Sequence, residues 1–326
     1  MLHKITFSLL AFLTLGITQL YALQPEQPYH RGKGTYVFTE YAPFKERPIT
    51  LHYYIPTKGD YRNMPVLFVI HGQSRAAADY LQAWVGFAER DGFVVICPRY
   101  IQELYPSWLY QFGGVTYKGE LQPRETWTYN TVEAIFDHFK KHTNSTAEVY
   151  DMFGHSAGGQ FVHRFALAMP ESRANIIVAA NPSTWTFPLI DGLPCKFSDK
   201  VYGWGVSVKG TPMANEETIK KFFARKLYVQ VGTQDIVADK QLAVSLDARS
   251  QGENRYERAR NFYQTCKKMA KKNGWEFNWQ KIEVKGIGHD TPGMVYGKSQ
   301  LVDGKKQYSI DDYTKTSAYY LIFKKK

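Results

Sequence analysis

The hydrophobic positions of this chain follow two patterns. Near the start, two β-rich runs bounded by turn residues, 34–39 and 49–56, are typical of an antiparallel pair of strands. The later runs are short and almost wholly apolar, as strands are when a sheet is covered on both faces. These runs span 66–70, 93–96, 149–153, 175–179 and 227–231, and a last strand is predicted over 278–284.

Stretches with helical periodicity lie between these strands. They cover 76–90, 129–141, 159–169 and 254–272, and a closing helix is predicted over 309–323. Strands that alternate with helices favour parallel βαβ units. The pattern therefore predicts a single α/β domain over 23–326, with a mostly parallel sheet, an antiparallel N-terminal pair and helices on both faces.

Two segments break the alternation. Residues 101–127 are dense in aromatic side chains, and residues 182–221 are punctuated by Pro and Gly. Long irregular insertions in a compact domain are often functional loops. We expect them to wall a substrate cleft as a partial lid; the alternative is aromatic padding over the edge of the sheet.

The first residues have the pattern of an export signal. Basic Lys4 precedes an apolar run over 5–20, and Ala22 offers a small residue at a cleavage point. This predicts a signal peptide over 1–22 and a secreted or periplasmic protein without stable membrane insertion after cleavage. An uncleaved membrane anchor is the alternative, because the run approaches the length of a span.

Composition narrows the possible partners and cofactors. The net charge of +11 comes largely from scattered lysines, and no nucleic-acid motif accompanies it, so we expect solvated lysines and no nucleic-acid partner. The three cysteines allow at most one internal disulfide, and their spacing is not that of metal ligands. We expect no metal and no cofactor. Oligomeric state stays open.

The most specific motif is Gly154-His155-Ser156-Ala157-Gly158, which lies between an apolar strand and a helical stretch. Such a strained strand-to-helix turn exposes a serine hydroxyl, and small flanking residues let the turn close. This context predicts that Ser156 is a catalytic nucleophile.

A serine hydroxyl needs a base to take its proton, and only two histidines follow Ser156. His163 lies within the helix after the turn. His289 lies in a glycine-rich loop just after the last predicted strand, from which it can reach the strand ends. We therefore predict that His289 is the base.

The acid of such a triad follows the preceding strand. Asp235 comes directly after the run 227–231 and is the favoured residue, with Asp239 as the rival. Its function would be to orient the imidazole and stabilise the imidazolium. Asp290 is adjacent to His289, and neighbouring side chains tend to point apart, so we expect it to be a loop residue.

Stabilisation of a developing oxyanion needs two backbone N–H groups. These are predicted to be those of Ala157, after the nucleophile, and Gln73, in the loop after the third strand. His71 precedes Ser156 in the chain and is expected to be structural. Arg75 could bind an anionic group or brace the loop.

Four segments together carry a resemblance to a known family: 69–72 (VIHG), 154–164 (GHSAGGQFVHR), 179–182 (AANP) and 286–289 (GIGH). They resemble the α/β-hydrolase superfamily, and more narrowly its secreted esterases related to poly(3-hydroxybutyrate) depolymerases and feruloyl esterases. The resemblance spans roughly residues 34–300. It implies the α/β-hydrolase fold, the order Ser, acid, His, and hydrolysis of carboxylic esters without a cofactor.

The sequence thus predicts an exported serine hydrolase that cleaves a small-molecule or polymeric ester through an acyl-enzyme. Two other functions stay open. A peptidase of the same fold would use the same triad in a different cleft. A catalytically silent binding protein could retain the scaffold. The aromatic insertions do not identify the substrate.

Overall fold

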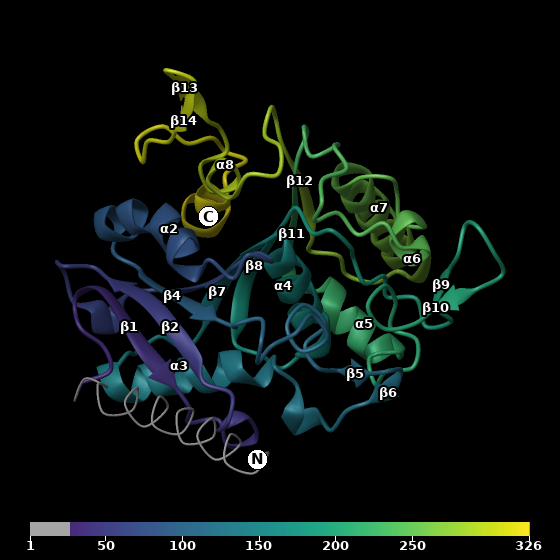
Figure 1. Cartoon of the computed structure of the whole chain (residues 1–326), viewed down its shortest axis with the longest axis horizontal. Coiled ribbons are helices and arrows are strands. Elements are labelled where there is room, and N and C mark those ends of the chain that lie inside the picture. Colours follow the sequence, from purple (N-terminus) through teal and green to yellow (C-terminus); the bar gives the residue numbers. More distant parts are fainter. Residues whose placement is uncertain (1–26, 326) are drawn as a thin grey trace, which may run out of the picture.

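The computed structural model describes residues 27–325, so the predicted signal peptide lies outside the described residues. Eight strands form one sheet in the order β1-β2-β4-β3-β7-β8-β11-β12 (Figure 1). Strands β1 and β2 pair antiparallel with each other, β2 pairs antiparallel with β4, and all later pairs are parallel. Their bounds are Gly32–Phe38 (β1), Ile49–Ile55 (β2), Val66–Ile70 (β3), Val94–Arg99 (β4), Tyr150–His155 (β7), Ala174–Ala180 (β8), Lys226–Gly232 (β11) and Gln280–Val284 (β12).

Helices cover both faces of this sheet, as the apolar runs predict. They are α2 (Ala77–Asp91), α3 (Asn130–Thr143), α4 (Ala157–Ala168), α5 (Glu216–Phe223), α6 (Leu246–Arg249), α7 (Arg255–Asn273) and α8 (Thr291–Tyr296). Apolar side chains of α3, α4, α5 and α7 pack in one core, and those of α2 and α8 pack in the other. The four longer helices were predicted within about two residues at each end.

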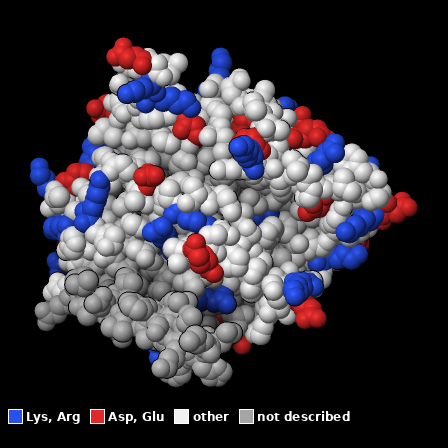
Figure 2. Space-filling view, in the orientation of Figure 1, with Lys and Arg blue, Asp and Glu red and all other residues white. Residues whose placement is uncertain are grey.

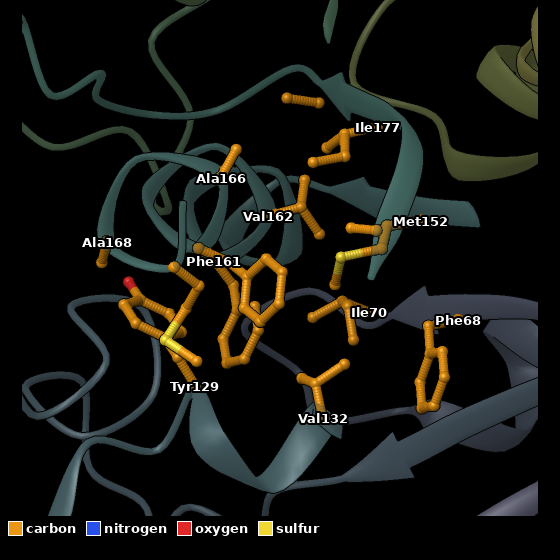
Figure 3. Packing of buried hydrophobic residues seen from close by; sticks show 14 of the residues in the cluster. Phe68, Ile70, Tyr129, Val132, Met152, Phe161, Val162, Ala166, Ala168 and Ile177 are labelled. Atoms are coloured by element: carbon orange, nitrogen blue, oxygen red, sulfur yellow. The ribbon is translucent and has the colours of Figure 1, made fainter. Parts of the chain in front are cut away.

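Strand β3 is buried on both faces of the sheet, which explains why its sequence is apolar at every position. Phe68 and Ile70 point into the core beneath α3 and α4, in the same cluster as Val132 and Phe161 (Figure 3). The intervening Leu67 and Val69 point into the core beneath α2. Since side chains alternate across a strand, a strand covered on both faces has no solvent side to carry polar residues.

Helix α7 begins and ends where its sequence provides caps. The side chain of Asn254 accepts a hydrogen bond from the N–H of Glu257 at 2.9 Å, and Gly274 ends the helix with a left-handed φ of 66°. This fixed start matters for the site, because Arg255 is the first residue of the helix.

The two insertions supply part of the buried core as well as exposed loop surface. Tyr105, Tyr110, Trp127 and Trp185 are all at most 2% exposed. Short hairpins stiffen the insertions: β5 (Thr116–Tyr117) with β6 (Glu120–Leu121), and β9 (Leu193–Pro194) with β10 (Val201–Tyr202). Helix α5 starts inside the second insertion, which the sequence had suggested to be irregular.

The predicted closing helix over 309–323 is wrong for most of its length. Residues 308–317 are turns and coil, and helical structure is confined to 318–324, with a π-helical turn at Tyr320–Lys324 (η4). Tertiary contacts hold the preceding segment in place: the N–H of Thr314 donates to the carbonyl of Tyr296 at 3.0 Å, and Arg90 bonds the carbonyl of Ile310. A hairpin of β13 (Gln300–Val302) and β14 (Lys305–Gln307) precedes this segment.

The remaining regular elements are short 3₁₀ turns at Ala42–Phe44 (η1), Tyr61–Asn63 (η2) and Arg124–Thr126 (η3). Among residues 27–325, no helix has the length and apolar character required to cross a bilayer. Nor does this part of the chain contain a group of three or more His, Cys, Asp or Glu side chains placed to hold a metal ion.

All three cysteines are free and buried. Cys97 and Cys266 belong to the cores on opposite faces of the sheet, and Cys195 lies next to β9. A disulfide needs Cα atoms within about 7 Å, so the sheet itself keeps the first two thiols apart.

We expect the unfolded protein to show three reactive thiols per chain without prior reduction. Titration with Ellman's reagent in concentrated guanidinium chloride measures this number. In the folded protein, Cys97 and Cys266 should react far more slowly, because burial raises the pKa of both thiols. A count of one thiol in the unfolded, unreduced protein would contradict the structure.

Candidate active site

Ser156 occupies a sharp turn between β7 and α4. Its backbone has φ 60° and ψ −118°, an uncommon and strained conformation for a residue with a side chain. The flanking glycines are required by close backbone contacts. A Cβ on Gly158 would lie 2.0 Å from the carbonyl oxygen of Ile70, and one on Gly154 would lie 2.2 Å from that of Gly158. The motif therefore forms the turn that its sequence predicts.

The structure brings Ser156, His289 and Asp235 into one chain of hydrogen bonds. Ser156 Oγ lies 2.9 Å from His289 Nε2, and His289 Nδ1 lies 2.8 Å from Asp235 Oδ2. The Asp235 side chain is 2% exposed and that of His289 is 18% exposed, so the acid is enclosed while the imidazole borders solvent. The sequence predicted these three residues, and the geometry is that of a serine-hydrolase triad.

Asp239 has no hydrogen bond to His289 in the described chain and is instead paired with Arg255. Both terminal guanidinium nitrogens of Arg255, Nη1 and Nη2, donate to the carboxylate of Asp239, at 2.7 and 2.8 Å, and this pairing lowers the pKa of Asp239 to about 2. Arg255 Nη1 also lies 3.2 Å from Asp235 Oδ1, the oxygen that His289 leaves free. Asp239 thus holds Arg255 in place, and Arg255 in turn bonds Asp235.

The loop after β3 lies directly against Ser156. A Cβ on Gly72 would be 3.6 Å from the Cβ of Ser156, and Gln73 lines the cavity above the serine. Within the described chain, the backbone N–H groups of Gln73 and Ala157 have no hydrogen-bond acceptor. For Ala157 this follows from its place as the first residue of α4, where helix N–H groups lack internal partners. An oxyanion hole built from these two groups stays a prediction.

His71 and Arg75 hold that loop in place. His71 is fully buried, its Nε2 accepts a hydrogen bond from the N–H of Tyr100 at 3.1 Å, and burial lowers its pKa to about 3. The structural role expected for it is confirmed. Arg75 donates to the side chain of Gln102 and the carbonyl of Tyr105, so it braces the loop and does not face the cavity as an anion-binding group.

His163 and Asp290 lie outside the triad, as expected. Nε2 of His163 accepts from the N–H of Thr186 at 3.0 Å inside the core. The carboxylate of Asp290 bonds Lys306 at 2.9 Å and also the hydroxyl of Tyr308. Asp290 therefore ties the histidine loop to strand β14 and the residue after it.

Comparisons with known proteins place this architecture in a family. No protein-family model matches the chain, and no curated protein matches its sequence. Among solved structures, it is similar to poly(aspartic acid) hydrolase-1 from Sphingomonas sp. KT-1, with 31% identity over 81% of this chain and 96% of the other, and a TM-score of 0.74. It is also similar to a poly(3-hydroxybutyrate) depolymerase from Bordetella parapertussis, with 30% identity over 86% of this chain and 93% of the other, and a TM-score of 0.75.

The chain belongs to the esterase family of the α/β-hydrolase superfamily. In this α/β-hydrolase, the serine, the acid and the histidine follow β7, β11 and β12 in chain order, as the superfamily pattern requires.

Sequence reasoning missed one residue that links all three loops of this α/β-hydrolase. Asn181 follows β8, is fully buried and has a left-handed φ of 48°. Its Oδ1 accepts from the N–H of Gly232 at 2.9 Å, and its Nδ2 donates to the carbonyl of Gly288 at 3.1 Å and to His155 Nε2 at 3.3 Å. These partners lie three residues before Asp235, one before His289 and one before Ser156. The segment 179–182 belonged to the family resemblance, but nothing in it indicated this role.

His155 completes the support of the histidine loop. Its Nδ1 lies 2.9 Å from Thr291 Oγ1, and its ring centre is 4.6 Å from that of His289. Burial, reinforced by the neighbouring His289, lowers the pKa of His155 well below its usual value. Its ring is therefore neutral, which lets Nε2 accept from Asn181 while Nδ1 donates to Thr291.

The cavity at the nucleophile has a volume of about 290 Å³. Its lining comes from the loop after β3, the start of α2, the turn after β7, the acid loop after β11 and the histidine loop after β12: Gly72, Gln73, Ser74, Ala76, Asp79, Tyr80, His155, Ser156, Gln241, His289, Thr291 and Pro292. No residue of either aromatic insertion lines it. The prediction that the insertions wall the cleft is wrong for this cavity, and four of their aromatic side chains, Tyr105, Tyr110, Trp127 and Trp185, are buried in the core instead.

A larger cavity of about 790 Å³ lies between the two insertions. It includes Trp127, Met169 and Met213 and adjoins the C-terminal end of α4, whereas Ser156 precedes the N-terminal end. Twelve helical residues at about 1.5 Å each separate the two ends, so this cavity is remote from the nucleophile.

Replacement of Asn181 by Asp keeps the shape but removes both donors of Nδ2. We expect kcat for ester hydrolysis to fall by about 10²-fold with KM little changed, because a misplaced histidine loop weakens catalysis more than binding. Steady-state kinetics, at a temperature where circular dichroism shows the variant fully folded, measures this split. Asn278→Asp, at an exposed asparagine near α5, is the matched control. A variant that only melts earlier and keeps its kcat would contradict a positioning role.

Proposed function

We propose that this protein hydrolyses carboxylic esters through an acyl-enzyme formed on Ser156. The observation that carries the proposal is the continuous hydrogen-bonded path from Ser156 Oγ through His289 to Asp235, at the edge of a cavity open to substrate. A second support is the family to which the chain belongs.

The first half of the proposed reaction forms the acyl-enzyme. Ser156 Oγ attacks the ester carbonyl while His289 Nε2 takes its proton, and Asp235 stabilises the imidazolium that results. The backbone N–H groups of Gln73 and Ala157 would bind the oxyanion of the tetrahedral intermediate. The imidazolium then returns the proton to the alkoxy oxygen, so the alcohol leaves as the C–O bond breaks.

The second half releases the acid. Water enters the place of the alcohol, His289 takes one proton from it, and the hydroxide oxygen attacks the acyl carbonyl. Collapse of this intermediate breaks the bond to Ser156 Oγ, which regains its proton from His289. The net reaction converts one ester and one water into one acid and one alcohol.

Amide hydrolysis is the second candidate, and one specific comparison favours it. The similar Sphingomonas protein is named for poly(aspartic acid), a polymer whose units are joined by amide bonds, whereas the Bordetella protein is named for a polyester. The same triad serves both reactions, since His289 can protonate either leaving group. Rates on an ester and an amide of the same acyl group separate the two candidates.

Three single substitutions test the triad. Ser156→Ala should abolish turnover of short p-nitrophenyl esters, and Asp235→Asn should lower kcat by about 10⁴-fold, as loss of the acid does in serine proteases. Asp239→Asn is the matched control: Arg255 still reaches Asp235, so we expect a loss of at most about 10- to 100-fold, the usual size when a supporting contact changes. Steady-state kinetics on the three purified variants gives these values.

Labelling by a fluorophosphonate probe provides a second readout. Wild type should be labelled at Ser156 and Ser156→Ala should not. If kcat fell as far in Asp239→Asn as in Asp235→Asn, the assignment of Asp235 as the triad acid would be contradicted. Wild-type protein that is neither labelled nor active on esters or amides would favour the silent binding protein.

We further propose that the protein is exported, with a small-molecule or polymeric ester as its substrate and no nucleic-acid partner. The support for export is the leader pattern in residues 1–22 of the sequence. Expression of the full chain in a bacterial host should yield mature protein that starts at Leu23 and is released by osmotic shock or found in the medium. N-terminal sequencing checks this, and an intact Met1 in the membrane fraction would indicate an anchor instead.

A further inference from the structure

The cavity at Ser156 has an uneven distribution of charge. Among its lining residues, the carboxylate of Asp79 is the single acidic group, and none is Lys or Arg. The other polar lining groups include the neutral side chains of Gln73, Ser74, Gln241 and Thr291. A substrate that reaches Ser156 therefore passes one fixed negative charge with no cation beside it in the wall.

Asp79 is not neutralised by its surroundings. It is exposed in the first turn of α2, and within residues 27–325 it has neither an ion pair nor a side-chain hydrogen bond. Lys240, next to the lining Gln241, is exposed and does not itself line the cavity. Two other basic groups on nearby loops are engaged. Arg75 is bonded to Gln102 and Tyr105, and Lys306 is paired with Asp290.

The high net charge of the chain does not cancel this local effect. Figure 2 shows Lys and Arg scattered over the visible face among acidic residues and not gathered into one basic region. At physiological ionic strength, charges farther than about 8 Å from a substrate are largely screened. A charge in the cavity wall is therefore screened less than the distant surface lysines, and Asp79 is the one Asp, Glu, Lys or Arg among the lining residues.

We propose that Asp79 sets the substrate class: esters with neutral or cationic acyl groups are accepted, and those with anionic acyl groups are disfavoured. The inference rests on the proposed ester hydrolysis. Two unit charges 4 Å apart in water repel by an amount that corresponds to about a five-fold change in binding. Poly(aspartic acid) carries a carboxylate on every residue, so this protein should differ in substrate from the similar Sphingomonas hydrolase.

Three esters of closely similar length test the proposal: neutral dimethyl adipate, anionic monomethyl adipate and cationic methyl 6-aminohexanoate. Titration of the released acid gives kcat/KM for each. Wild type should prefer the neutral and cationic esters to the anionic one. Asp79→Asn should raise the anionic-to-neutral ratio of kcat/KM by about five-fold and lower the cationic-to-neutral ratio, and 0.5 M NaCl should shrink both changes.

Asp191→Asn is the matched control, because it removes the same charge from an exposed position outside the cavity lining. Its ratios should equal those of wild type. The proposal is overturned if Asp79→Asn leaves the ratios unchanged, if Asp191→Asn shifts them equally, or if wild type prefers the anionic ester. No turnover of any of the three esters by wild type would instead refute the ester hydrolysis on which the inference rests.

Discussion

Ser156 holds a backbone conformation that costs an ordinary residue about 1–3 kcal/mol, and the arrangement of the site depends on that turn. The strain persists because α4 is fixed against the sheet. Gly158 packs directly on the carbonyl of Ile70, and Phe161 and Val162 are buried in the core with β3 (Figure 3). Packing of the helix thus holds the serine hydroxyl at the carboxyl edge of the strands, where the acid and histidine loops can reach it.

Those loops have no regular secondary structure, so individual polar contacts must fix them. Asn181 joins three of the segments that carry the triad, and Arg255 joins the two candidate acids. Asn181, Arg255 and Asp235 are buried, and a buried donor or acceptor left without a partner costs about 1–3 kcal/mol. Small displacements of the loops are therefore opposed by several hydrogen bonds at once.

The chemistry and the selectivity of the site come from different parts of the chain. The triad and its supports lie at the ends of β7, β8, β11 and β12, while the rest of the cavity wall comes from the loop after β3, the start of α2 and the loops after β11 and β12. The aromatic insertions, which are the most unusual segments of the sequence, contribute to the core instead. Substrate preference consequently depends on a few short polar segments, with Asp79 as their fixed charge.

The sequence by itself determined the sheet and the longer helices, because apolar runs and helical periodicity are local signals. It also predicted the three residues that the structure joins by hydrogen bonds, from a glycine-flanked serine between a strand and a helix and from the chain order of an acid and a histidine after later strands. The sequence favoured Asp235 over Asp239 as the acid but did not reveal the role of Asp239. That role depends on its ion pair with Arg255, which lies sixteen residues further along the chain. The sequence also assigned no role to Asn181 and misplaced the aromatic insertions and the closing helix. Only the tertiary structure decided the role of Asn181 and the places of the insertions and the C-terminal segment. A long-range hydrogen bond, or the placement of a side chain in the core or in a cleft, depends on which distant segments meet, and no local sequence pattern indicates that.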